Sequence, residues 1–161
     1  MSAQPDQMAR LGWQVRAMRA RDLDSVAAIE HDIYPFPWTR GNFQDSLKAG
    51  YDAWVFEQAG SIIGYSVLMW APEELHVLNL SVAAGRQSQG LGRAMLRWLC
   101  EDARARGAVT LMLEVRPSNT RALALYQSAA FRSIGVRKRY YPSYDETRED
   151  AWVLVRDLRN E

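Results

Sequence analysis

The chain has few features that would commit it to a membrane, an oxidising compartment or a metal. Its one cysteine, Cys100, excludes an internal disulfide, and we expect it to be a small buried hydrophobe in a reducing cytoplasm. No apolar run approaches the roughly 20 residues of a membrane span, and the N-terminus has no apolar core of signal-peptide length. The two histidines, His31 and His76, lack the partner spacing of a metal site or a catalytic triad. The sequence therefore predicts a cytoplasmic protein without a metal centre.

Net charge is also nearly absent. The 20 Lys and Arg residues against 19 Asp and Glu residues leave +1, which indicates neither a nucleic-acid binder nor an acidic tail, so any anion site is local. The 161 residues fit one domain, and a hydrophobic content of 48% is enough for a core. Residues 1–13 are polar and aperiodic, so we expect a loose tail there and a folded domain over residues 14–161.

Hydrophobic periodicity predicts alternating strands and helices. Asp22 and Thr39 are the expected N-caps of two helices, and Gly60 marks a tight turn between two strands. The expected strands cover residues 15–20, 53–58, 62–70, 75–82, 109–116, 131–138 and 151–156, and two further helices cover 91–106 and the segment after Asn119. Hairpins mixed with strand–helix–strand units predict an α/β fold, with a mixed, mostly antiparallel sheet and helices on both faces.

The strongest chemical signal is the segment from Arg86 to Arg93, Arg-Gln-Ser-Gln-Gly-Leu-Gly-Arg, between an expected strand and a long helix. The start of a helix exposes unpaired N–H groups and the positive end of its dipole, which together bind phosphate. Glycines there let the ligand approach the backbone. The P-loop motif is absent, and the dinucleotide fingerprint lacks its third glycine. For Gly90 or Gly92 alone an ordinary helix start is the favoured interpretation, but the whole segment favours pyrophosphate binding.

Counted from Gln87, this turn resembles the acetyl-CoA signature of the GCN5-related N-acetyltransferase (GNAT) superfamily, Arg/Gln-x-x-Gly-x-Gly/Ala. Ser88 stands where an arginine is common, a departure expected to weaken phosphate contacts without altering the chemistry. Further segments resemble one bacterial branch, the ribosomal-protein-alanine N-acetyltransferases: residues 36–38 (Phe-Pro-Trp), 113–119 (Leu-Glu-Val-Arg-Pro-Ser-Asn) with 124–126 (Ala-Leu-Tyr), and 139–142 (Arg-Tyr-Tyr-Pro) with 148–151 (Arg-Glu-Asp-Ala). The resemblance spans residues 15–158.

The resemblance implies a single-domain GNAT fold whose sheet splays open between the strand ending at Val82 and the strand bearing Glu114. Acetyl-CoA is the implied co-substrate in this opening. Its implied contacts are Leu80, Ser81, Val82, Gln87, Ser88, Gln89, Gly90, Leu91, Gly92, Arg93 and Asn119. The implied acceptor cleft is lined by Phe36, Trp38, Tyr140 and Tyr141, although some of these aromatics could instead cover the edge of the core.

Glu114 is the candidate base, since a carboxylate near an amine can take its proton. Along residues 109–116 the odd positions are apolar, so Glu114 falls on the opposite face. A solvated strand residue paired with Arg116 is an equal alternative on residues alone, and the family resemblance favours the base. Tyr126 is the candidate acid, because a phenol with a pKa of about 10 stays protonated at neutral pH. A core aromatic is the alternative, and the family-like spacing from Asn119 favours the acid.

Two other features allow more than one interpretation. Glu30 interrupts the apolar stripe of the first helix and could bind an amine, but a salt bridge on the helix surface is the favoured interpretation. The basic and aromatic segment from Arg137 to Tyr141 could bind RNA. Because the segment is short and the net charge nearly neutral, we expect it to contact a ribosomal-protein tail, without a direct nucleic-acid partner.

These observations and the resemblance predict an acetyl-CoA-dependent N-alpha-acetyltransferase that acts on the N-terminal alanine of a ribosomal protein. A lysine or small-amine N-acetyltransferase of the same fold stays open as an alternative. A non-catalytic acyl-CoA- or RNA-binding module is less favoured, because both Glu114 and Tyr126 are present.

Overall fold

The structure, a computed structural model, describes residues 12–159. Its strands form one seven-stranded sheet in the order β1-β2-β3-β4-β5-β7-β6. Only the β4–β5 pair is parallel, so the predicted mixed, mostly antiparallel sheet is confirmed. The strands are β1 (Trp13–Ala17), β2 (Asp52–Gln58), β3 (Ser61–Ala71), β4 (Glu74–Val82), β5 (Thr110–Val115), β6 (Arg132–Pro142) and β7 (Arg148–Asp157).

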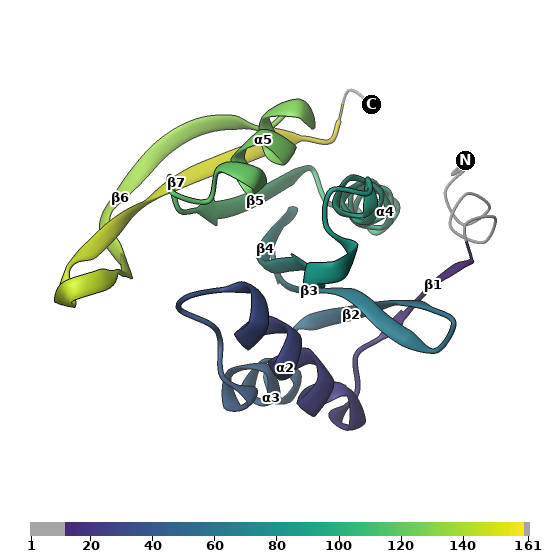
Figure 1. The fold of residues 1–161 in the computed structure, drawn as a ribbon. Helices are drawn as coiled ribbons and strands as arrows, with labels where there is room; N and C mark the ends of the chain where they lie inside the picture. The colour runs from purple at the N-terminus through teal and green to yellow at the C-terminus, as the bar shows by residue number, and fades with distance from the viewer. Residues whose placement is uncertain (1–11, 160–161) are drawn as a thin grey trace.

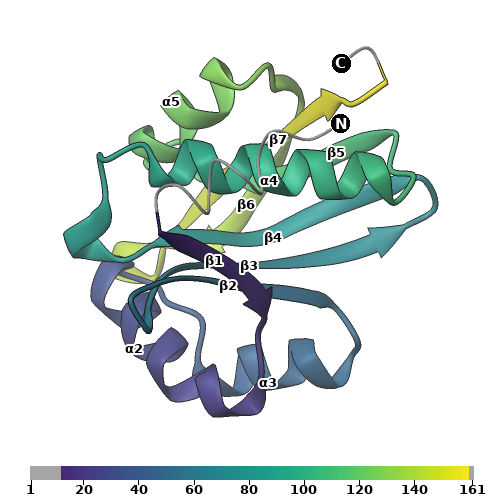
Figure 2. The same ribbon diagram turned by 90° about the vertical axis from the view of Figure 1, so that its right-hand side faces the viewer.

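Helices cover both faces of the sheet, as predicted (Figure 1). Figure 2 shows α4 running along one face while α2 and α3 lie below the other, and α5 lies on the same side as α4. The α-helices are α2 (Leu23–Ile33), α3 (Arg40–Lys48), α4 (Leu91–Ala105) and α5 (Thr120–Ser128), with 3-10 turns at η1 (Ala20–Asp22), η2 (Ala84–Arg86) and η3 (Tyr144–Glu146). Among the described residues, no helix is long and apolar enough to cross a membrane.

The two predicted N-caps differ in outcome. Thr39 caps α3, because its side chain accepts a hydrogen bond from the Asn42 amide at 3.1 Å. Asp22 occupies the N-cap position of α2, but its carboxylate makes no capping bond there. It binds both terminal nitrogens of Arg16 at 2.7 and 2.8 Å, and this guanidinium holds the pKa of Asp22 below its usual value. The predicted position of the N-cap at Asp22 is therefore right, but its side chain does not cap the helix, because the carboxylate is paired with Arg16.

Helix α4 packs closely against the sheet. Its buried residues include Leu96, Leu99 and Cys100, and Cys100 is 2% exposed, which confirms the predicted small buried hydrophobe. The approach is tightest at Gly64 on β3, where a Cβ would lie 2.7 Å from the Met95 sulfur and 2.9 Å from the Ser81 carbonyl oxygen. Glycine at position 64 thus allows Met95 of α4 to pack close to the backbone of β3 and β4.

The implied splay of the sheet is present between β4 and β5. The two strands pair only along Glu74–Val77 and Thr110–Leu113, whereas β4 continues to pair with β3 as far as Val82. Residues 78–82 therefore have no strand partner on the β5 side within the described part of the chain. This opening positions the site.

Some boundaries differ from the prediction. The first strand begins at Trp13 and ends at Ala17, earlier than the expected residues 15–20, and most of the expected tail over 1–13 lies outside the described residues. The sixth strand extends to Pro142, past the expected end at 138, with an irregularity between Arg137 and Tyr141. The β6–β7 hairpin therefore carries the basic and aromatic segment on a strand.

Candidate active site

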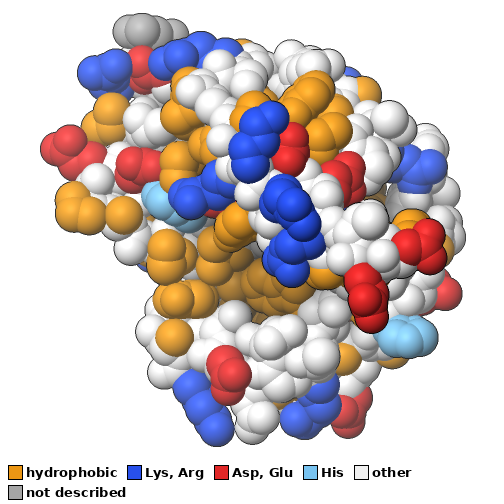
Figure 3. All heavy atoms as spheres, turned by 90° about the vertical axis from the view of Figure 1, so that its left-hand side faces the viewer, with side chains coloured by type: hydrophobic (Ala, Val, Ile, Leu, Met, Phe, Trp, Pro, Cys, Tyr) orange, Lys and Arg blue, Asp and Glu red, His pale blue; other side chains and the backbone are white. Residues whose placement is uncertain are grey.

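A cavity of about 990 Å³ opens where β4 and β5 part. Its walls come from the ends of β4 and β5, the turn before α4, the start of α5, the loop between α2 and α3, and the end of β6. In Figure 3 the molecule is hollowed, with hydrophobic side chains inside and Lys and Arg side chains beside the opening. Elements far apart in the sequence therefore meet around one space.

The turn before α4 has the geometry expected of an anion-binding helix start. Gly90, the N-cap, has a φ of 81°, and the first intrahelical hydrogen bond runs from the Ala94 amide to the Gly90 carbonyl at 3.1 Å. The preceding amides of the first turn thus have no intrahelical acceptor. The Gln87 side-chain amide donates to the Val82 carbonyl at 3.0 Å and ties the turn to the end of β4. Gly92 lies in the cavity wall, and a Cβ there would be within van der Waals distance of the Leu125 and Val82 side chains, at 3.5 and 3.7 Å.

Most of the residues implied to bind acetyl-CoA reach the cavity wall: Leu80, Val82, Gln87, Ser88, Gly90, Gly92, Arg93 and Asn119. The side chains of Ser81 and Leu91 are buried in the protein behind this wall, and the Gln89 amide donates to the Gly85 carbonyl at 3.3 Å. Asn119 also caps α5, because its side-chain oxygen accepts from the Ala122 amide at 3.2 Å. The turn and the start of α5 thus face the same space.

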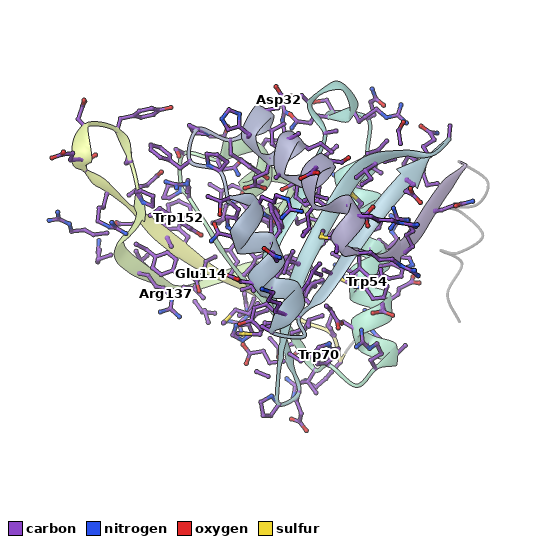
Figure 4. All side chains as sticks on the ribbon, turned by 90° about the horizontal axis from the view of Figure 1, so that it is seen from below. Asp32, Trp54, Trp70, Glu114, Arg137 and Trp152 are labelled. Carbon is purple, nitrogen blue, oxygen red and sulfur yellow. The ribbon has the colours of Figure 1, made fainter. Side chains whose placement is uncertain are left out.

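Glu114 lies near the end of β5 in the cavity wall, on the face opposite the buried Leu113 and Val115. Its Oε1 lies 3.3 Å from the Arg137 Nε, and Figure 4 shows the two side chains near each other at the base of the hairpin. Its Oε2 is buried and has no hydrogen-bond partner among the described residues. A buried carboxylate oxygen without a donor is costly, so a ligand donor would be favoured there.

The pairing of Glu114 with Arg116, considered as the alternative from the sequence, does not occur in the structure. Arg116 lies 3.4 Å from Glu149 and donates to the Pro142 carbonyl at 2.7 Å. Glu149 also accepts bonds from the Ser118 amide and hydroxyl, each at 2.8 Å. Arg116 is thus part of the joint between the end of β5 and the β6–β7 hairpin.

Tyr126, on α5, is 7% exposed and also lies in the cavity wall. Burial raises the pKa of its phenol above the usual value of 10, so the hydroxyl stays protonated well beyond neutral pH. Its ring packs on Phe131 at 5.4 Å between centroids, so the core contact considered as the alternative exists as well. Among the residues described, none hydrogen-bonds its hydroxyl.

Aromatic side chains form the wall away from the phosphate turn. Phe36, Trp38 and Tyr141 line the cavity, and the Arg116 guanidinium lies over the rings of Phe36 and Tyr141 at 5.1 and 4.4 Å. Trp38 also packs on the core residue Phe43. Tyr140 is not in the wall: it is 44% exposed and its ring lies 4.9 Å from that of Tyr141. Three of the four expected cleft aromatics therefore meet here.

Glu30 is the residue that sequence reasoning placed wrongly. It is 2% exposed, not on the helix surface, and it lines the cavity. Its Oε1 accepts from the Tyr65 hydroxyl at 2.8 Å and the Asn79 amide at 3.0 Å, and its Oε2 accepts from the Trp38 backbone N–H at 3.0 Å. The sequence did contain a signal for this burial: Glu30 lies seven residues after the buried Leu23, which is two helical turns, so it belongs to the face of α2 that points to the core.

Tyr34 and Asn79 also line the cavity and were not predicted. The Tyr34 hydroxyl lies 2.7 Å from the Ser81 hydroxyl, which donates to the Asn79 side-chain oxygen at 2.6 Å. Burial raises the pKa of Tyr34 to about 12. A polar chain therefore joins the loop between α2 and α3, which begins at Tyr34, with β4 and Glu30. In residues 12–159 no three His, Cys, Asp or Glu side chains are grouped to hold a metal, and His76 pairs with Glu74 at 2.8 Å.

Comparison with known proteins identifies the class to which this fold and cavity belong. Residues 23–131 match the model of the acetyltransferase (GNAT) family, and the chain belongs to that family. It is 34% identical over 141 residues to the [ribosomal protein bS18]-alanine N-acetyltransferase of Escherichia coli K12, covering 88% of this chain and 95% of the relative. The crystal structure of the ribosomal-protein-S18-alanine N-acetyltransferase from Escherichia coli matches with a TM-score of 0.83 at 32% identity, covering 92% of this chain and 98% of that one. The expected branch resemblance is confirmed.

The protein is thus an N-acetyltransferase, and acetyl-CoA is its acetyl donor. A putative acetyltransferase from Salmonella typhimurium, solved with its cofactor acetyl-CoA, has the same fold with a TM-score of 0.74 at 18% identity, covering 93% of this chain and 96% of that one. The residues present here fit such a donor. The unpaired edge of β4 can hydrogen-bond an extended amide-bearing arm, and the amides before Ala94 can bind its phosphates.

Proposed function

We propose that the enzyme acetylates the α-amine of an N-terminal alanine on a ribosomal protein. Similarity to the ribosomal-protein-alanine enzymes over nearly the whole chain supports this acceptor. The observation that carries the chemistry is the Glu114 Oε2, a buried carboxylate oxygen in the cavity wall without a donor of its own. The single cysteine, Cys100, is buried and has no second cysteine in the chain for an internal disulfide, which is consistent with a cytoplasmic enzyme.

In this proposal Glu114 is the general base and Tyr126 the general acid. Glu114 takes the proton of the acceptor amine through Oε2, while Arg137 near Oε1 holds the carboxylate in place. The amine nitrogen bonds to the acetyl carbon, and the bond from that carbon to sulfur breaks. Tyr126 gives its proton to the departing thiolate, for which a phenol kept protonated by burial is suited. Acetyl transfer is direct, without an acyl-enzyme.

The donor would be bound along the open edge of β4 and at the turn before α4. The residues proposed for this role are Leu80, Ser81, Val82, Gln87, Ser88, Gln89, Gly90, Leu91, Gly92, Arg93 and Asn119. Ser81 and Leu91 would act through their backbones, because their side chains are buried. This arrangement would place the thioester between Glu114 and Tyr126, where β4 and β5 part.

The acceptor would enter between Phe36, Trp38 and Tyr141, with Tyr140 supporting Tyr141 from outside. An aromatic pocket of this kind suits a small first side chain. Such pockets discriminate by only about 1–3 kcal/mol per methylene, so serine- and glycine-starting peptides should keep some activity.

A pair of peptides tests the acceptor against the lysine alternative. One starts with alanine and lacks lysine, and its twin has a blocked N-terminus and one internal lysine. The reference pKa is about 7.7–8.0 for an α-amine and about 10.4 for lysine, so at pH 7.5 the terminus is favoured roughly a hundredfold before binding. We expect kcat/KM to favour the alanine peptide at least that strongly. Equal values, or a preference for the blocked twin, would make the enzyme a lysine acetyltransferase.

A further inference from the structure

The Glu30 carboxylate is buried without a cation. All three of its hydrogen-bond donors are neutral: the Tyr65 hydroxyl, the Asn79 amide and the Trp38 backbone N–H. No Lys, Arg or His in the described part of the chain forms an ion pair with it. Donors to both oxygens suit the ionised form, which only accepts hydrogen bonds. The protein therefore buries the Glu30 carboxylate with neutral hydrogen-bond donors and without a positively charged side chain beside it among the described residues.

Such an arrangement is costly unless something else completes it. Removing a carboxylate from water costs several kcal/mol, and buried carboxylates are usually paired with a cation. Glu30 and Glu114 both line the cavity, from different walls, α2 and β5, and the buried Oε2 of Glu114 has no hydrogen-bond partner among the described residues. Two carboxylates facing one space, one with a donor-free oxygen and the other without a cation, define a site for a small cation carried by the ligand.

We propose that Glu30 is a binding subsite for the protonated α-amine of the acceptor. This inference rests on the proposed function, because that acceptor supplies the cation. An ammonium group has three N–H donors, and Glu30 Oε2, with only one donor in the structure, can accept another. The ammonium would bind to Glu30 and lose its proton to Glu114. Glu30 thus selects a charged amine over a neutral group of the same size.

The bonds to Glu30 also set where that charge lies. Trp38 belongs to the loop between α2 and α3, Tyr65 to β3 and Asn79 to β4, so the carboxylate is held from three elements. Glu30 therefore fixes the acceptor amine relative to β4, the strand along which the donor would lie.

The test compares binding of two ligands to three proteins. The ligands are an alanine-starting peptide and the same peptide with hydrogen in place of its α-amine, measured by calorimetry with coenzyme A present. The proteins are the wild type, Glu30→Gln and the control Tyr65→Phe, which removes one hydrogen bond to Glu30 Oε1 but keeps the charge. We expect the wild type and Tyr65→Phe to prefer the amine by on the order of 10–100-fold, as for hydrogen bonds between charged groups. Glu30→Gln should lose this preference, and its KM for the peptide should rise more than its kcat falls.

Each outcome decides the matter. If folded Glu30→Gln keeps the preference, or if Tyr65→Phe loses it equally, the charge of Glu30 is not the subsite. If Glu30→Gln does not fold, Glu30→Asp takes its place, because it keeps the charge on a shorter side chain. If the logarithm of its amine preference falls to less than half of the wild-type value while its acetyl-CoA affinity is unchanged, the subsite is supported. An unchanged amine preference overturns it. If the wild type does not acetylate the alanine peptide at all, the proposed function fails and the subsite fails with it.

Discussion

Replacing Glu114 by glutamine tests the proposed base with little change of shape. The side chain keeps its length and its place on β5, but Oε2 can no longer take a proton. The ion pair with Arg137 is lost too, yet that arginine is 53% exposed, so the fold should lose less than about 1 kcal/mol. Any large effect should therefore appear in catalysis.

The expected loss of kcat in Glu114→Gln depends on how much of the acceptor amine is already neutral at the pH of the assay. General bases contribute about 10²–10⁴-fold, and an α-amine is about one tenth neutral at pH 7, which places Glu114→Gln near the low end. A hundredfold fall in kcat corresponds to about 2.7 kcal/mol in activation free energy. The deficit should narrow toward pH 9, where about nine tenths of the amine is neutral without help.

The assay measures release of free thiol at saturating acetyl-CoA and alanine peptide, at pH 7 and pH 9. Arg137→Gln is the control, because it removes the partner of Oε1 and leaves Oε2 in place; we expect it to cost less than tenfold. A kcat for Glu114→Gln within threefold of the wild type at pH 7 would refute the reasoning and make Glu114 a structural residue.

Three further predictions concern other parts of the molecule. Tyr126→Phe should lower kcat by about 10²–10⁴-fold, and because burial raises the pKa of this phenol, wild-type kcat should not fall on the alkaline side below pH 10; a fall below pH 9 would contradict its role. Gly90→Val should weaken acetyl-CoA binding in calorimetry, whereas Gly60→Val, with the same φ of 81° in a turn outside the cavity wall, should bind normally; equal affinities would count against the phosphate turn. Gly64→Ala should cost about 1–3 kcal/mol and lower Tm by roughly 2–12 °C, while Gly135→Ala, which has open space for a Cβ, should change Tm little; similar melting of the two would contradict the packing.

The elements that sequence predicts well are those whose signals are local. The helix expected over residues 91–106 is α4 (Leu91–Ala105), because its apolar positions recur at the helical period and two glycines mark its start. The same holds for β5, where alternation placed Glu114 opposite the buried face.

Partners across the fold are not local, and there the sequence fails. Glu30 finds its donors 8, 35 and 49 residues away, and only the assembled sheet brings Tyr65 and Asn79 beneath α2. Likewise Glu114 pairs with Arg137 from the hairpin rather than with Arg116 two residues away, because Arg116 is engaged by Glu149 and the Pro142 carbonyl, which lie far from it in the sequence. The splay was known only through the family resemblance, since no residue pattern in β4 shows where pairing stops.

The short β4–β5 pairing has a consequence for how the protein opens. Because these strands are joined only along Glu74–Val77, the sheet consists of an antiparallel half before the opening and a smaller half, β5, β7 and β6, after it. Each half has its own ladder of hydrogen bonds, so local opening can proceed in one without the other. A donor that contacts both halves, as proposed, would raise the free energy of opening by RT ln(1 + [L]/Kd), where [L] is the free donor concentration. Amide exchange along β5 and the last residues of β4 should therefore slow when acetyl-CoA binds, and the substrate becomes part of what makes the sheet behave as one cooperative unit.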